Sequence, residues 1–135
     1  MIYRRQIPVE FNHCDPAGIV FYPRYFEMMN SVIENFFREV LDYSFARMSR
    51  EGRAVPTAHL EVDFTAPSYL GDVLDWQLTV ARLGRSSVTF HLVAGCGGEQ
   101  RLTARPVLVW LSPERRPAPW PETIRPRLAA HQEAP

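Results

Sequence analysis

The sequence contains no lysine, since all fifteen of its basic residues are arginine. A lysine Schiff base, a lysine nucleophile and a P-loop that grips phosphate through lysine are therefore excluded. Any phosphate has to be bound by arginine or by backbone amides. Fifteen acidic residues balance the arginines, and the zero net charge argues against nucleic acid or an anionic membrane as a partner.

Cysteine is scarce as well. The only two cysteines, Cys14 and Cys96, are too few for the disulfide framework of a small secreted domain. No hydrophobic run is long enough to span a membrane, and the first residues lack the apolar core of a secretory signal. A cytoplasmic protein with reduced thiols is the simplest interpretation. The length of 135 residues and the hydrophobic content of 46% fit one globular domain.

Hydrophobic periodicity predicts one long helix among several strands. Apolar and polar residues alternate over 3–11, which is typical of a strand. Over 26–41 apolar residues recur every three or four positions, which predicts an amphipathic helix that is covered on most sides. A short helix is expected over 44–51, ended by Gly52. Four β-branched and aromatic segments predict further strands, joined in part by turns at 84–86 and 95–98; they are 59–64, 73–83, 87–94 and 102–111.

Proline becomes frequent after residue 112. We therefore expect a domain over 1–112 and a semi-extended, proline-rich C-terminal tail over 113–135. Within this tail, Pro121 is expected to open a short helix that runs through Leu128, and the final residues are expected to be disordered.

The segment 13–26 joins the first strand to the long helix and contains one carboxylate, Asp15, in an otherwise apolar turn. Asp15 precedes a proline, which disfavours helical backbone, and Gly18 permits a sharp change of direction. Pro23 suits the first position of a helix. Backbone N–H groups near Tyr22 would then face out of the helix start, where the dipole favours negative charge. One loop thus combines an acid with a terminus that stabilises an oxyanion.

Two motifs carry a resemblance to a known family. The run Asp15-Pro16-Ala17-Gly18-Ile19-Val20-Phe21-Tyr22-Pro23 resembles the signature loop of the 4-hydroxybenzoyl-CoA thioesterase family of hot-dog proteins. A more general hot-dog pattern follows in Val62-Asp63-Phe64-Thr65-Ala66-Pro67 and Gly71-Asp72-Val73-Leu74. The resemblance implies an α+β hot-dog fold, in which a curved antiparallel sheet wraps a long central helix. It also implies hydrolysis of an acyl-CoA thioester, with an aromatic acyl group like that of 4-hydroxybenzoyl-CoA.

The resemblance also assigns roles in the loop. In this family the aspartate is the catalytic group, and the backbone N–H at the tyrosine position polarises the thioester carbonyl, so these roles pass to Asp15 and Tyr22. Asp15 would attack the carbonyl or activate a water. The residues alone also allow Asp15 to be a turn residue that bonds its own loop. Glu27 on the long helix is an alternative acid.

Coenzyme A would be held by basic residues near a turn between strands. The residues of this chain at the comparable place are Arg82, Arg85, Ser86 and Ser87, with Thr57 and His13 as further substrate contacts. Solvated surface arginines are an equally good explanation of this turn. Tyr25, Phe26 and Phe36 are candidates for an apolar acyl pocket, and core packing would explain them equally well.

Neither a metal nor another cofactor is expected, because the histidines and cysteines have no paired ligand spacing; coenzyme A would be part of the substrate. Cys14 lacks a suitably placed base and is interpreted as a small structural residue. In the resembled family the active site lies between subunits. The resemblance therefore implies a homo-oligomer, with a dimer as the minimum and a tetramer favoured.

Three other functions stay open. The first is hydrolysis of short-chain aliphatic acyl-CoA, although the group that does this typically has histidine where this chain has Pro23. The second is hydration of an enoyl thioester, for which His13 beside Asp15 would have to supply an acid–base pair. The third is a module that binds acyl thioesters without catalysis.

Overall fold

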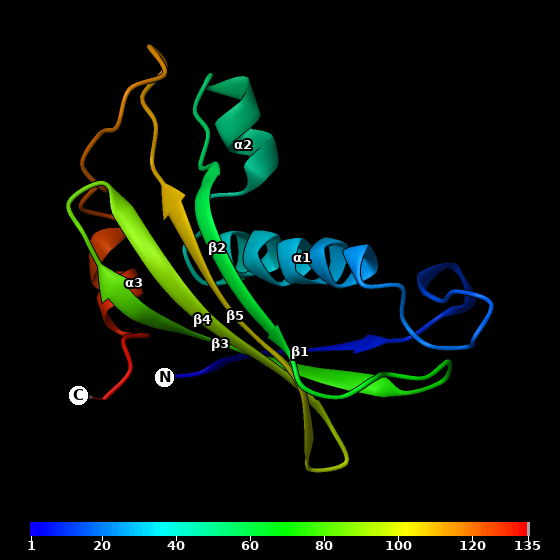
Figure 1. The fold of residues 1–135 in the computed structure, drawn as a ribbon. Coiled ribbons are helices and arrows are strands. Elements are labelled where there is room, and N and C mark those ends of the chain that lie inside the picture. The colour runs from blue at the N-terminus through cyan, green and yellow to red at the C-terminus, as the bar shows by residue number, and fades with distance from the viewer. Residues whose placement is uncertain (135) are drawn as a thin grey trace.

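The computed structural model describes residues 1–134 and contains one antiparallel sheet and one long helix (Figure 1). The strands are β1 (Tyr3–Pro8), β2 (Thr57–Phe64), β3 (Val73–Leu83), β4 (Ser87–Cys96) and β5 (Glu99–Val109). The helices are η1 (Phe11–His13, a 3₁₀ turn), α1 (Pro23–Glu39), α2 (Phe45–Arg50) and α3 (Arg125–Ala129). The sheet order is β1-β3-β4-β5-β2, and the α+β architecture predicted from the sequence is confirmed.

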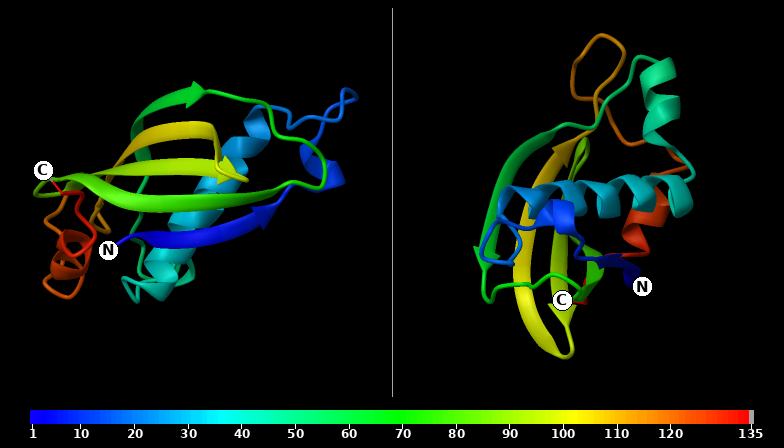
Figure 2. Two further views of the ribbon diagram at one scale, coloured as in Figure 1. Left: turned by 90° about the horizontal axis from the view of Figure 1, so that it is seen from below. Right: turned by 90° about the vertical axis from the view of Figure 1, so that its right-hand side faces the viewer.

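The sheet curves around α1, which lies on its concave side (Figure 2). Side chains on that side of the strands are buried at every second position, as the period of a β-strand requires. The buried stripe of α1 packs onto them, and Phe36 lies 5.5 Å from Phe90 between ring centroids. The opposite face of α1 carries Asn30 and Glu34, which are exposed. A long amphipathic helix is thus confirmed, with one side uncovered in the single chain.

Local chemistry explains several element boundaries. The Ser44 hydroxyl accepts a hydrogen bond from the Arg47 N–H at 3.0 Å and caps the start of α2. Gly97 and Gly98 have positive φ in the β4–β5 turn. The first strand is shorter than predicted, because η1 takes up residues 11–13 directly before the 14–20 loop.

The proline-rich segment after residue 112 packs against the domain. Trp120, Ile124 and Leu128 are buried within the hydrophobic core. The helix α3 begins at Arg125, not at Pro121 as expected from the sequence. Pro126 does not break the helix, because it lies in the first turn, where the backbone N–H that proline lacks would have no intrahelical acceptor.

The expectation of disorder in the last residues is wrong for the part that the structure describes; Pro135 lies outside the described residues. The Glu133 N–H donates to the Val80 carbonyl at 2.9 Å, and the Thr79 hydroxyl donates to the Glu133 carboxylate at 2.8 Å. His91 contacts the same carboxylate. Burial acts to raise the pKa of Glu133, but the Thr79 and His91 hydrogen bonds lower it overall.

The strand β2 forms one edge of the sheet and pairs only with β5 among the described strands. Nearly all of its residues are exposed. Phe64 at its end and Leu60 in its middle are 48% and 37% exposed, which is unusual for large apolar residues beside an open strand edge. Within residues 1–134, no helix has the length and apolar character needed to cross a bilayer.

Candidate active site

The loop between η1 and α1 folds as a tight turn around Asp15. The Asp15 N–H donates to the Ile19 carbonyl and the Gly18 N–H to the Asp15 carbonyl, each at 3.0 Å. Gly18 has φ of 78°, a conformation that favours glycine. The Oδ1 atom of Asp15 accepts a hydrogen bond from the Ala17 N–H at 2.9 Å. Asp15 is therefore a turn residue in the single chain, with Oδ2 free of hydrogen-bond partners among residues 1–134.

The start of α1 supplies one donor. Tyr22 precedes Pro23, the first helical residue. The N–H groups of Arg24 and Tyr25 already donate to the carbonyls of Phe21 and Tyr22. No acceptor within the described chain takes the Tyr22 N–H, so this group is left at the positive end of the helix dipole. This N–H is the group that the sequence motif predicts to donate a hydrogen bond to the thioester oxygen.

A second loop, residues 65–72, holds the first one in place. The Val20 N–H donates to the Ser68 carbonyl at 2.9 Å. The Tyr25 hydroxyl donates to the fully buried Ser68 hydroxyl, also at 2.9 Å. The start of α1 and the Asp15 turn are thereby fixed to the segment that follows β2.

Arg101 on β5 anchors that second loop. Its guanidinium donates to the Asp72 carboxylate at 2.8 Å and to the Pro67 carbonyl at 3.1 Å, and only 8% of the residue is exposed. Hydrogen bonds from the Tyr69 N–H and, to a smaller extent, from Arg101 lower the pKa of Asp72 below its usual value. Sequence reasoning missed this network. The Gly71-Asp72 motif marked one half of it, but nothing in the sequence singled out Arg101.

An aromatic cleft of about 310 Å³ opens beside the start of α1. The residues that line it are Val20, Tyr22, Tyr25, Phe64, Thr65, Ala66 and Pro67. The Phe64 ring is 6.1 Å from that of Tyr22 and 6.3 Å from that of Phe26. Of the aromatic residues proposed from the sequence, only Tyr25 lines this cleft, and it is also part of the buried core. Phe26 packs beside Phe64 without lining the cleft, and Phe36 lies in the core.

The coenzyme A candidates lie at the other end of the sheet. Ser87 is paired with Val109 on β5, and Thr57 is paired with the neighbouring Leu108. Arg82, Arg85 and Ser86 belong to the same β3–β4 corner. The length of β2, about 23 Å at 3.3 Å per residue, separates this corner from the Asp15 turn. Within one chain the two groups of predicted site residues are not brought together.

The remaining candidates have local partners. The Nδ1 atom of His13 accepts a hydrogen bond from the Glu10 N–H at 2.9 Å, so His13 stabilises η1. Glu27 is exposed and pairs with Arg24 at 3.1 Å. In the part of the chain that the structure describes, no three His, Cys, Asp or Glu side chains are grouped as metal ligands.

An antiparallel sheet curved around one long helix is the architecture of the hot-dog fold. The family model described as the Thioesterase-like superfamily matches residues 9–128. The chain therefore belongs to this thioesterase-like hot-dog superfamily.

Three known proteins are similar to this chain over nearly its whole length. It is 25% identical over 125 residues to a 1,4-dihydroxy-2-naphthoyl-CoA hydrolase of Synechococcus elongatus, covering 91% of this chain and 92% of the relative. A thioesterase from Thermus thermophilus, solved with coenzyme A and Zn, is 32% identical, with 98% and 95% coverage and a TM-score of 0.80. A gentisyl-coenzyme A thioesterase has the same fold, with a TM-score of 0.82, 23% identity and coverage of 95% and 99%.

Proposed function

We propose that this protein hydrolyses an acyl-CoA thioester whose acyl group is aromatic, to the free acid and coenzyme A. The observation that carries the proposal is the aromatic cleft at the start of α1, where the Tyr22 N–H is free. Aromatic walls favour a flat acyl group through edge-to-face contacts. The names of the naphthoyl-CoA and gentisyl-CoA relatives support the same class of substrate.

The loop residues supply the chemistry. The Tyr22 N–H donates to the thioester oxygen as negative charge develops on it. The free Oδ2 of Asp15 either attacks the carbonyl, giving an anhydride that water cleaves, or takes a proton from the attacking water. In both routes the C–S bond breaks, the sulfur leaves as thiolate and takes up a proton, and water supplies the new oxygen. These steps call for no metal or redox cofactor, and the cytoplasm is the expected compartment of such a substrate.

A second copy of the chain completes the site. The open edge of β2 carries exposed Leu60 and Phe64, which pairing with another β2 would cover. Antiparallel pairing about a two-fold axis would bring the Thr57 end of one β2 beside the Phe64 end of the other. The coenzyme A corner of one copy would then face the Asp15 turn of its partner. We take this dimer as the minimal active unit and expect it to pair further into a tetramer.

Release of free thiol from a panel of CoA esters tests the function. Benzoyl, hydroxybenzoyl and naphthoyl esters should be cleaved with a kcat/KM at least about tenfold above acetyl or butyryl esters, because only flat rings fill the cleft. A reversed preference would favour the short-chain alternative. Water addition to an enoyl-CoA without thiol release would favour a hydratase, and binding without turnover would favour a non-catalytic module.

The assembly has its own test in sedimentation velocity. Wild type should sediment as a dimer or tetramer, and Leu60→Glu should yield inactive monomers because it places a charge on the β2 surface. Arg105→Glu on the adjacent β5, where the side chain is exposed, is the matched control and should leave the dimer intact. A monomeric wild type with full activity would contradict the shared site.

A further inference from the structure

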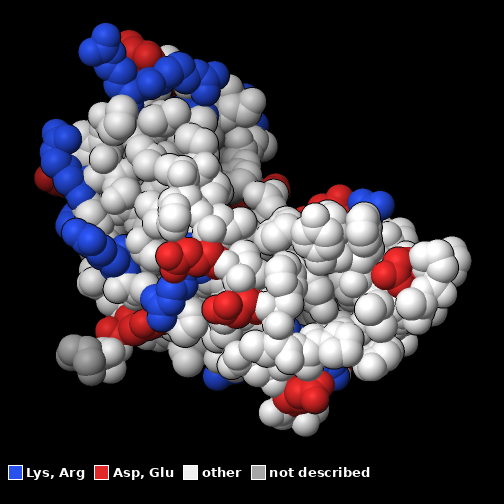
Figure 3. Space-filling model, in the orientation of Figure 1, with Lys and Arg blue, Asp and Glu red and all other residues white. Residues whose placement is uncertain are grey.

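Arginines are concentrated at one end of the molecule although the net charge is zero. Segments 44–57, 82–87 and 111–130 contain nine of the fifteen arginines but only three of the fifteen acidic residues. The three segments are neighbours, since the Trp110 N–H donates to Ser86, the Leu111 N–H to Ala54 and the Arg125 guanidinium to Gly84. We call them the basic end. In Figure 3 basic side chains line the top and left edges of the molecule, away from the Asp15 loop.

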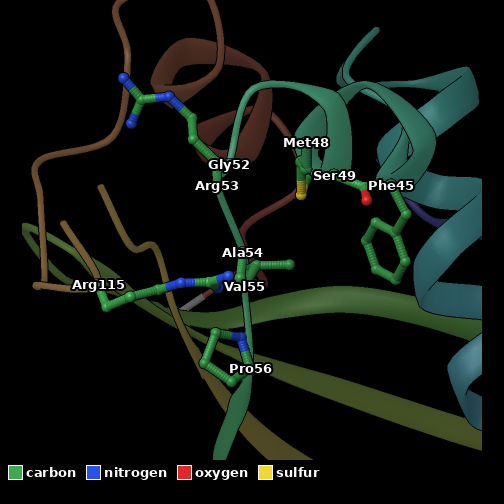
Figure 4. Close-up of a pocket in the computed structure, with 9 residues that line it drawn as sticks. All are labelled: Phe45, Met48, Ser49, Gly52, Arg53, Ala54, Val55, Pro56 and Arg115. Atoms are coloured by element: carbon green, nitrogen blue, oxygen red, sulfur yellow. The ribbon is translucent and has the colours of Figure 1, made fainter. Parts of the chain in front are cut away.

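A cleft of about 390 Å³ lies in the basic end, between α2 and the chain that leads into β2 (Figure 4). Phe45, Met48, Val55 and Pro56 make most of its surface apolar. Arg115 extends across the open side of the cleft towards Val55, whereas Arg53 points away from it (Figure 4). The Arg53 guanidinium lies over the Trp110 ring at 5.4 Å.

The loop fixes the backbone of Arg115, and the guanidinium has no carboxylate partner within residues 1–134. Its loop is closed by hydrogen bonds from the Ser112 N–H to the Arg116 carbonyl at 2.8 Å and from the Arg115 N–H to the Ser112 carbonyl at 2.9 Å. Arg115 has φ of 64°, a conformation unfavourable for a residue with a Cβ atom. Arg115 is in no ion pair with an acid of residues 1–134. A free guanidinium at the mouth of an apolar cleft suits a ligand with a flat apolar part and a phosphate.

We infer that this cleft binds the nucleotide end of coenzyme A, with the adenine against Phe45 and Met48 and a phosphate on Arg115. The inference rests on the proposed function and extends its site. Pro56 in the cleft directly precedes Thr57, the first residue of β2, and antiparallel pairing would bring this end of β2 to the Tyr22 cleft of a second copy. Each β2 edge would then carry a nucleotide site at one end and an acyl site at the other.

Calorimetric titration of the assembled protein with coenzyme A and with pantetheine tests the inference without any turnover. Wild type should bind coenzyme A at least about tenfold more tightly than pantetheine. Arg115→Gln should weaken coenzyme A binding about tenfold, the loss of one charge-assisted hydrogen bond, and leave pantetheine binding unchanged. Ser49→Trp, which fills the cleft from α2, should have the same effect without removing a charge. Arg116→Gln, the neighbouring exposed arginine, is the control and should bind coenzyme A like wild type.

Two results would overturn the inference: coenzyme A affinity unchanged in both Arg115→Gln and Ser49→Trp, or an equal loss in Arg116→Gln, which would indicate only a diffuse positive field. The outcome is separable from that of the proposed function. The expected binding pattern without any thioester cleavage would support the nucleotide site and contradict the proposed activity. Cleavage of aroyl-CoA esters with equal coenzyme A affinity in all variants would support the proposed activity and contradict the nucleotide site.

Discussion

Replacing Arg101 by methionine removes the anchor of the 65–72 loop while keeping an apolar stem of similar length. Arg101 is buried and donates to both Asp72 and Pro67. Breaking a fully buried ion pair costs about 3–5 kcal/mol. The Asp72 side chain is 25% exposed, so water replaces part of the lost interaction, and we expect about 2–3 kcal/mol. For a chain of this length that corresponds to a fall in Tm of about 7–11 °C.

Thermal unfolding followed by circular dichroism measures the effect. Arg105→Met is the matched control, because Arg105 lies on the same strand with its side chain exposed, and it should melt within about 2 °C of wild type. Since the 65–72 loop holds Ser68 against Val20 and Tyr25, Arg101→Met should also lower kcat/KM. A Tm equal to that of the control would refute the anchoring role of Arg101.

Three further changes test other parts of the fold. Trp120→Ala should cost about 3–5 kcal/mol in a urea unfolding series, because Trp120 is buried in the core; a loss below about 1 kcal/mol would mean that the C-terminal segment is dispensable. Gly18→Ala should cost about 1 kcal/mol through its positive φ, since an added Cβ meets no atom within 4 Å; an unchanged Tm would contradict this strain. The Tyr69 N–H and Arg101 lower the folded-state pKa of Asp72, so its stabilisation is complete above about pH 5 and disappears as pH falls through the folded pKa. Asp72→Asn should therefore flatten the acid side of the stability profile, and an equally steep profile would refute it.

The long helix and most strands could be predicted because their apolar residues follow local periods. The α1 stripe and the alternation on β3 and β4 are properties of neighbouring residues alone. The Arg101–Asp72 contact joins positions 29 residues apart, and no period marks such a pair. The aromatic residues of the cleft could not be predicted for the same reason. Phe64 reaches the cleft because β2 packs beside the start of α1, whereas Phe36 packs on Phe90 in the core, and neither contact follows from a local period.

The tail shows why composition can mislead. Its many prolines favour an extended chain, but Trp120 and Ile124 bury enough apolar surface to hold it against the core. The candidate site was predictable only in part, for a related reason. The Asp15 and Tyr22 motif is continuous in sequence, whereas the Thr57–Ser87 corner belongs to the opposite end of the sheet. Whether the two meet depends on an interface between copies, which no single-chain pattern specifies.

The most direct test of the catalytic assignment compares Asp15→Asn and Glu27→Gln with wild type in hydroxybenzoyl-CoA hydrolysis. Asparagine retains the Oδ1 that accepts the Ala17 N–H, so the turn and the Tm should stay unchanged while the free carboxylate oxygen is lost. This role of Asp15 predicts a fall of at least about 100-fold in kcat for Asp15→Asn and no more than about a twofold change for Glu27→Gln. Full activity in Asp15→Asn would contradict it, and a selective loss in Glu27→Gln would move the catalytic acid to the helix.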